Sequence, residues 1–280
     1  MAATAGTAGS SRARCIAADS TVALRPECAM DANAWVLIVG AVAAGFVQGL
    51  SGFAFGLVAT SIWAWWLPPQ LIAPMSVFGA LTGQVVAMIT TRRPMQWPRL
   101  APLVAGGLCG LPLGVWLLPR LDSATFQFGV GLLLAVWCPT MLLSARIPRL
   151  HHGGRWADAA AGMAGGMTGA IGGFTGPLPT LWCTLRGWDK DTLRGVIQNF
   201  NLVMLGATFA SYLASGVVTR SMWPQFALVA PALLVPVLLG ARLYAGISPE
   251  GFKRVVLALL SCTGVALLLR SVPAVWARLA

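Results

Sequence analysis

Four glycines recur at the same spacing in two distant stretches of the chain. They occupy positions 45, 49, 52 and 56, and again positions 165, 169, 172 and 176, so each set is spaced by four, three and four residues. This spacing puts each set along one stripe of a helix. Glycine destabilises a helix interior by roughly 0.5–1 kcal/mol relative to alanine, so two such stripes need a structural reason. Either another backbone packs closely against the stripe, or the helix stops and restarts there.

The composition indicates an integral membrane protein. Of the 280 residues, 57% are hydrophobic and 10% are charged, whereas an ordinary soluble domain carries about 25% charged residues. The net charge of +11 is typical of basic loops that orient a multispan protein by the positive-inside rule. No basic run is long or interleaved with aromatic residues, so we expect the lipid bilayer and not nucleic acid as a partner.

We predict an all-α integral membrane protein with about eight hydrophobic segments, each near the length of about 20 residues that crosses a bilayer. The first and fifth segments are too long for a simple span and carry the glycine stretches, so we expect both to be broken or re-entrant. The predicted segments are 34–66, 71–90, 100–118, 125–144, 157–185, 195–217, 223–243 and 253–271.

The two halves of the chain match beyond the glycines. Trp97-Pro98 opens the third segment and Trp223-Pro224 opens the seventh, and Gly114 and Gly240 follow at the same offset. We therefore predict two homologous four-segment repeats, an arrangement typical of transporters. The predicted boundaries are a disordered tail at 1–33, repeat 1 at 34–144, a basic cytoplasmic linker at 145–156, repeat 2 at 157–272 and a C-terminal tail at 273–280.

The second glycine stretch predicts a broken helix. Pro177 has no amide hydrogen and clashes with a preceding helical turn, but it suits the first position of a new helix. We expect one helix to end near Gly172 and another to begin near Pro177. Non-helical backbone at membrane depth is tolerated only where protein or a watery cavity covers it. For the first stretch, which has no proline, helix packing and helix breakage remain alternatives.

A broken helix in a duplicated membrane protein points to a binding site, and the new helix N-terminus suits an anion. We expect bare amides around Ser51-Gly52 and around Gly173-Thr175 to hold a small anion, with hydroxyls of Ser51 and Thr175 adding hydrogen bonds. A polar cluster at 198–201 either lines the path or ties helices together. The candidate substrate-binding residues are Gly49, Ser51, Gly52, Gly169, Gly172, Gly173, Thr175, Gln198, Asn199 and Asn201. A glycine outside the two stretches, such as Gly131, is expected to tolerate alanine.

Catalytic chemistry finds little support in the sequence. The histidines, His151 and His152, are adjacent in the linker, no cysteine pair has CxxC spacing, and no carboxylate lies in the middle of an apolar segment. We therefore expect no enzyme activity, no metal site and no cofactor.

The duplicated four-segment unit, the glycine-rich front of each half and the Gly–hydrophobic–Phe pattern before the last segment of each half resemble the sulfite exporter TauE/SafE family over about residues 34–272. The resemblance implies a multi-pass transporter of the bacterial inner membrane for small anions, notably sulfite, sulfonates and related organic anions. Of its typical Gly-hydrophobic-Gly-Gly-Gly stretch, the second copy here, Gly169-Ala-Ile-Gly172-Gly173, keeps more than the first. A non-transporting membrane scaffold or assembly protein is the alternative, and a homo-oligomer remains open.

Two topologies fit this pattern. If all eight segments cross the membrane, the halves are parallel and both termini are cytoplasmic. If the first and fifth segments turn back at their glycines, each half has three crossings and the halves are inverted. The inverted arrangement gathers most basic residues on one side, so the positive-inside rule favours it.

Overall fold

The computed structural model describes residues 26–52, 54–90, 95–143, 154–243 and 249–279. These ranges contain helices and no strand, and seven helices are long and apolar enough to cross a membrane, namely α2, α4, α5, α6, α9, α10 and α11. The predicted all-α membrane fold is thereby confirmed. The helices are α2 (Pro26–Ser51), α3 (Phe55–Trp63), α4 (Pro69–Thr90), α5 (Trp97–Leu117), α6 (Ser123–Leu143), α7 (Gly154–Gly172), α8 (Pro177–Leu185), α9 (Lys190–Ala214), α10 (Trp223–Leu243) and α11 (Pro249–Leu279).

Both long segments that carry the glycine stretches are interrupted. The first is divided into α2 and α3 by residues 52–54, which we call the first break. The second is divided into α7 and α8 by residues 173–176, the second break, and its helices end at Gly172 and begin at Pro177 as predicted. Gly52 (φ +83°) and Gly173 (φ +77°) follow directly after the helices that end. The left-handed backbone of these two residues strains any residue with a side chain, which explains why glycine stands there.

Each short helix folds back along the helix that precedes it, so α2–α3 and α7–α8 form two helical hairpins. In the first hairpin, the indole Nε1 of Trp63 at the end of α3 donates to the carbonyl of Val36 in α2, at 3.0 Å. In the second hairpin, Nε1 of Trp182 in α8 donates to Asp158 near the start of α7, at 2.8 Å. The chain therefore turns back at both breaks.

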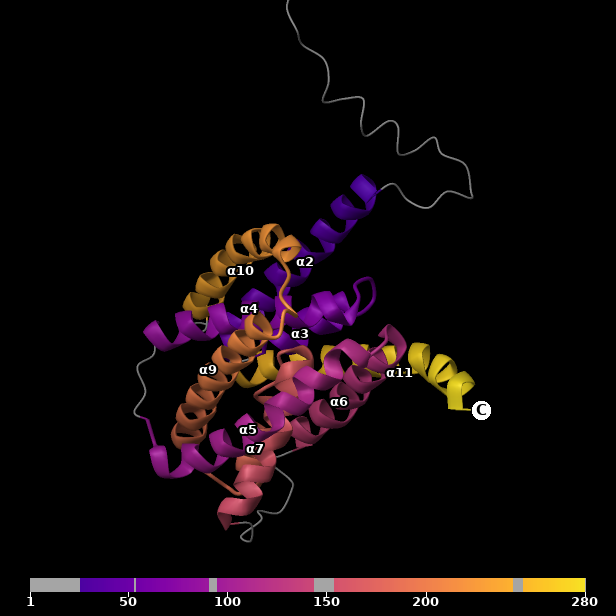
Figure 1. The fold of residues 1–280 in the computed structure, drawn as a ribbon. Helices are drawn as coiled ribbons and strands as arrows, with labels where there is room; N and C mark the ends of the chain where they lie inside the picture. Colours follow the sequence, from indigo (N-terminus) through magenta and orange to yellow (C-terminus); the bar gives the residue numbers. More distant parts are fainter. Residues whose placement is uncertain (1–25, 53, 91–94, 144–153, 244–248, 280) are drawn as a thin grey trace, which may run out of the picture.

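Glycine stripes bring helices of opposite halves into backbone contact. A Cβ added to Gly106, Gly110 or Gly114 of α5 would meet carbonyls of α7 at positions 159, 163 and 167 in turn. These numbers rise together, so α5 and α7 run parallel. In the same way, Gly45 and Gly49 of α2 pack on carbonyls of α10 at positions 233 and 237. Figure 1 shows both pairs side by side, with α10 along α2 and α5 along α7.

These directions place the two hairpins at opposite ends of the bundle. The hairpin α7–α8 enters from the end where α5 begins, because α5 and α7 are parallel and the tip of α8 returns to Asp158. The hairpin α2–α3 enters from the end where α10 begins, because α2 and α10 are parallel and Trp63 returns to Val36. Hydrogen bonds at each end agree. Gln96, directly before α5, donates to Thr192 of α9 at one end, and Gln70 of α4 donates to the Leu121 carbonyl at the other.

The basic residues of the described helices are unevenly divided between the two ends. The end at which α5 and α7 begin, which we call the basic end, carries Arg99, Arg155, Arg186, Lys190, Arg194, Arg242, Lys253 and Arg254. The opposite end carries Arg120, Arg220, Arg270 and Arg278. This bias follows the pattern that orients multispan proteins with their basic loops in the cytoplasm.

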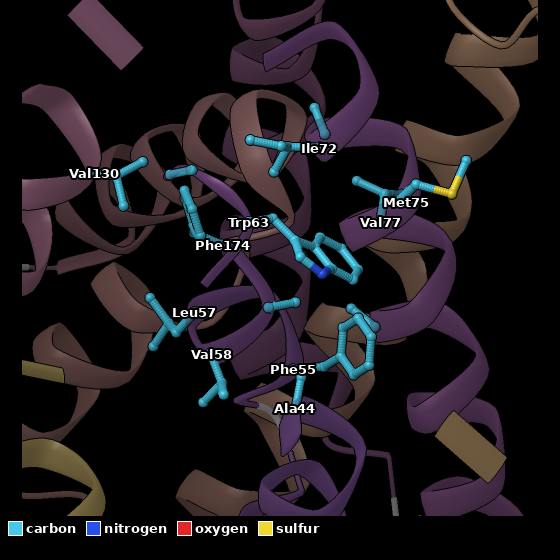
Figure 2. Packing of buried hydrophobic residues seen from close by; sticks show 14 of the residues in the cluster. Ala44, Phe55, Leu57, Val58, Trp63, Ile72, Met75, Val77, Val130 and Phe174 are labelled. Carbon is cyan, nitrogen blue, oxygen red and sulfur yellow. The ribbon is translucent and has the colours of Figure 1, made fainter. Parts of the chain in front are cut away.

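The core lies where the two breaks approach each other. Figure 2 shows Phe174 of the second break among side chains of α3, close to Trp63 and Leu57. Phe55 and Trp63 are fully buried and stack edge to face, with ring centroids 6.2 Å apart. In a bilayer, where the lipid is as apolar as these side chains, such contacts stabilise the fold through van der Waals packing. The breaks are thus held by packing from both halves.

The outer boundaries of the predicted repeats fall inside helices. The helix α2 begins at Pro26, before the predicted boundary at 34, and α11 continues to Leu279, past the boundary at 272. Most of the predicted N-terminal tail and most of the predicted linker at 145–156 lie outside the described residues. The homology of the two halves remains a prediction, although the element order of residues 26–143 recurs over 154–279.

Candidate functional site: the second helix break

The second break presents a run of unbonded amides. Residues 172–177 are all buried, and the amide of Gly173 still donates to the Gly169 carbonyl at 2.8 Å. Within the described residues, no acceptor faces the next amides along the chain, those of Phe174, Thr175, Gly176 and Leu178. Buried N–H groups without partners are rare because each costs about 1–3 kcal/mol. The N-terminus of α8 is therefore a ready site for an acceptor, and its partial positive charge favours an anion.

Asn201 of α9 adds a side-chain donor to the same place. The Thr175 hydroxyl donates to Asn201 Oδ1 at 2.9 Å, and the two residues are each 2% exposed. This bond fixes the orientation of the amide and leaves its Nδ2 group without an acceptor among the described residues. Thr175 thus orients Asn201, and Asn201 offers two N–H donors beside the break.

The first break is closed by its own side chains. The amide of Phe55 donates to Gln48 Oε1 at 2.8 Å, and the amide of Ala54 donates to Ser51 Oγ at 3.3 Å. The Ser51 hydroxyl donates to the Val47 carbonyl at 2.8 Å, and the Gly52 amide donates to the Gln48 carbonyl at 2.7 Å. The expectation of bare amides around Ser51 and Gly52 is therefore wrong. The side-chain oxygen of Gln48 occupies the place an anion would take at the N-terminus of α3.

The two breaks nevertheless meet. A Cβ added to Gly56, at the start of α3, would lie 2.5 Å from the Gly173 carbonyl oxygen. Thr60, one turn further along α3, donates to the Gly172 carbonyl at 3.3 Å and lies 3.0 Å from the Ser76 hydroxyl of α4. Side chains of α3 and α4 thereby occupy the carbonyl side of the second break and leave its amides for another partner.

One face of α4 packs against residues of both breaks and their flanking helices. A Cβ added to Gly173 would lie 3.2 Å from the Ser76 backbone, and one added to Gly83 would lie 2.7 Å from Gln48 Cγ. Gly79, between them on the same face, leaves room for the Phe55 ring. The small residues of α4 at positions 76, 79 and 83 therefore let Gln48 and the second break approach the same helix.

The predicted polar cluster on α9 divides between two faces. Residues 199 and 201 are about 200° apart around a helix, so their side chains point in opposite directions. Asn201 faces the second break, whereas Asn199 Nδ2 donates back to the Gly195 carbonyl of its own helix at 2.8 Å. The backbone carbonyl of Gln198 accepts from Gln84 of α4 at 3.1 Å. Of the three candidates, the structure brings Asn201 to the break.

The candidate glycines have different neighbours. Gly49 packs against the backbone of α10 at Val237 and Gly240, and so serves helix packing. Gly169 leaves room for the Thr175 methyl group, and a Cβ on Gly172 would lie 2.5 Å from the Phe174 ring. Gly49 therefore allows close helix packing, whereas Gly169, Gly172 and Gly173 shape the second break.

Three residues around the breaks are not among those predicted from the sequence, namely Gln48, Thr60 and Ser76. Gln48 is a polar residue inside the first glycine stretch of an apolar segment, and this position could have identified it as a candidate. Thr60 and Ser76 carried no such signal, because hydroxyls are common in membrane helices and commonly bond to their own backbone. Their contacts join residues 16 and 112 positions apart in the chain.

A buried ion pair closes the second hairpin at the basic end. Arg186 Nη1 contacts Asp158 Oδ1 at 2.6 Å and Oδ2 at 2.7 Å, with the carboxylate side chain 7% exposed. Trp182 donates to the same carboxylate, and the Arg186 guanidinium lies over the Trp188 ring. A carboxylate that the sequence places at a segment end is thus enclosed by α7 and α8.

Removing one member of this pair should strongly destabilise the protein, because the remaining charge stays buried without a partner. We expect Arg186→Met to reduce the free energy of unfolding by about 3 kcal/mol. The double variant Asp158→Asn with Arg186→Met should recover part of this loss, which thermal unfolding in detergent would measure. Equal melting temperatures for the single and double variants would show that the pair is not coupled.

The groups around the second break are hydrogen-bond donors and acceptors. Among the described residues, no three of the His, Cys, Asp and Glu side chains gather as metal ligands, and no side chain that reaches the break is charged. The donors at the break are backbone amides and one carboxamide, which are groups that can hold an anion without reacting with it.

Comparison with known proteins gives one family. A family model described as Sulfite exporter TauE/SafE matches residues 37–267, which is most of the chain and includes both breaks. The comparisons with curated proteins and with solved structures found no match.

Proposed function

Because this chain belongs to the sulfite exporter TauE/SafE family of membrane transporters, we propose that it moves a small oxyanion, such as sulfite or an organosulfonate, through the second break. The observation that carries the proposal is the run of amides at residues 174–178, beside Asn201, that have no hydrogen-bond acceptor among the described residues. Hydrogen bonds from such groups to a charged ligand stabilise binding by about 1.5–3 kcal/mol each.

The geometry favours transport over storage of the anion. Non-helical backbone at the start of α8 supplies donors without a neutralising cation, so the ligand is held by dipoles and is not trapped by a full charge. The break is buried, so the anion enters and leaves only when a hairpin or α9 moves. Two hairpins from opposite ends of the bundle offer one moving element for each side of the membrane.

The proposed setting is the inner membrane of a bacterium, with the basic end in the cytoplasm. The uneven division of Lys and Arg between the two ends supports this orientation. The second hairpin would then open toward the cytoplasm and the first toward the outside. A non-transporting scaffold would need neither the unbonded amides nor Asn201.

Uptake of labelled sulfite and of a panel of organosulfonates into proteoliposomes tests the function. We expect Asn201→Leu to weaken the apparent affinity about tenfold, because each lost hydrogen bond of about 1.4 kcal/mol is a factor of ten. Thr175→Ala should have a smaller effect in the same direction, since it frees the Asn201 amide to rotate. Both effects would be read from the concentration dependence of uptake.

Asn199→Leu is the matched control, because Asn199 lies on the same helix and bonds only its own backbone carbonyl among the described residues. It should leave the affinity within about twofold of wild type. No uptake of any anion by the folded wild-type protein would favour the scaffold alternative. Equal effects of the substitutions at 199 and 201 would remove Asn201 from the site.

A further inference from the structure

Among the described residues, the groups that reach the second break are all neutral. The break and its flanking residues Gly172 and Pro177 receive contacts from Thr60 of α3, Ser76 of α4, Trp137 of α6, Thr168 of α7 and Asn201 of α9. The helices α3, α4 and α6 contain no Asp, Glu, Lys or Arg anywhere along their length. Around the break, an anion therefore meets only dipoles within contact distance.

The charges on the remaining neighbouring helices lie near the basic end. Arg194 of α9 precedes Asn201 by seven residues, which is about 10 Å along a helix. Arg186, directly after the end of α8, follows Pro177 by nine residues, about 13 Å, and it is already paired with Asp158. A full positive charge is thus absent from direct contact with the break among the described residues, although Arg194 adds attraction from a distance.

We infer that the site selects singly charged oxyanions over doubly charged ones of the same shape, an inference that rests on the proposed function. The cost of moving an ion out of water rises with the square of its charge, and for a single charge it is already several kcal/mol in a real protein. The attraction to amide dipoles and to a distant arginine rises only in proportion to the charge. A second charge therefore adds more cost than attraction unless a cation is in contact with it.

Hydrogen sulfite and alkylsulfonates carry a single negative charge, whereas sulfate carries two. All of them present sulfur-bound oxygens of similar size to the same donors, so charge is the main difference between methanesulfonate and sulfate. The site would thereby discriminate among anions that could not be separated by shape. A methyl group in methanesulfonate takes the place of one sulfate oxygen and needs no hydrogen bond.

Competition in proteoliposomes of wild-type protein tests the inference. Uptake of labelled sulfite is measured at mildly acidic pH, where the hydrogen sulfite ion dominates, against unlabelled methanesulfonate or sulfate. Methanesulfonate should inhibit uptake at concentrations at least about a hundredfold lower than sulfate, two factors of ten in affinity. Sulfate that competes as well as methanesulfonate would overturn the inference while leaving the proposed transport intact. Absence of sulfite uptake would instead refute the proposed function.

A charge introduced at the break gives a second test. Asn201→Lys places an ammonium beside the amides and should improve sulfate competition relative to methanesulfonate by about tenfold or more. Asn199→Lys, on the opposite face of α9, is the matched control and should not change the ratio. An unchanged ratio in a folded Asn201→Lys variant would show that charge at the break does not set selectivity. The wild-type competition decides the matter if that variant does not fold.

Discussion

Replacing Gly172 with leucine will abolish anion transport while the protein still inserts into the membrane. A Cβ at this position would lie 2.5 Å from the Phe174 ring, and Phe174 is 3% exposed within the core shared by the two halves. The leucine must therefore displace Phe174 and with it the amides that follow. Transport in proteoliposomes measures the loss, and size-exclusion chromatography in detergent reports whether the variant is monodisperse.

Gly129→Leu is the control for this variant. Gly129 lies on an exposed face of α6, and a Cβ there would meet nothing within 4 Å, so transport should stay near the wild-type rate. Gly131 cannot serve, because a Cβ on it would lie 2.9 Å from the Gly264 carbonyl of α11, and the expectation that alanine is tolerated there is wrong. A monodisperse Gly172→Leu protein that transports normally would show that the second stretch only packs helices.

Alkaline phosphatase fused to the C-terminus will be active, because we expect the C-terminus to lie outside the cytoplasm, and a fluorescent protein fused there will be inactive. The helix α11 begins at the basic end and runs to Leu279 at the opposite end, because Arg270 of α11 lies over the Trp65 ring beside the end of α3. If the basic end faces the cytoplasm, α11 ends outside. Paired alkaline phosphatase and fluorescent-protein fusions distinguish the two sides without ambiguity, since each is active on one side only.

A fusion placed after Leu143, at the end of α6, is the internal control. This position lies at the basic end, where α7 also begins, so the reporter should be cytoplasmic there. C-terminal activity on the cytoplasmic side, with the fusion after Leu143 also cytoplasmic, would contradict the inverted arrangement. It would require that one hairpin crosses the membrane completely.

The two breaks differ in whether their amides are hydrogen-bonded, and this difference bears on how many anions could bind at once. At the first break, Gln48 Oε1 accepts the Phe55 amide, and at the second break the equivalent amides have no such acceptor among the described residues. A side-chain oxygen thus closes one helix N-terminus, whereas the other keeps the unbonded amides that the proposed anion would need. A single anion per cycle is the simplest expectation from this arrangement, since only one break offers unbonded donors among the described residues.

The sequence by itself was sufficient for the local features of the fold. The apolar composition and segment lengths determined an all-α membrane protein, because a bilayer leaves few other ways to satisfy a spanning backbone. Pro177 and Gly173 determined where the second hairpin breaks. Proline cannot continue a helix, and glycine adopts the left-handed backbone at position 173 without strain. The spacing of the glycine stripes indicated close helix packing, which the contact of Gly49 with α10 shows.

Only the tertiary structure decided which of these features form the candidate site. Gly52 and Gly173 have the same backbone conformation, yet Gln48 closes the first break, and no described side chain closes the second. Asn199 and Asn201 are alike in sequence, and the direction from which the second hairpin approaches α9 separates their roles. Local propensity determines where a helix stops. Whether the free amides at the start of the next helix find an acceptor depends on contacts between residues far apart in the chain. The spacing of residues within one stretch does not predict those contacts.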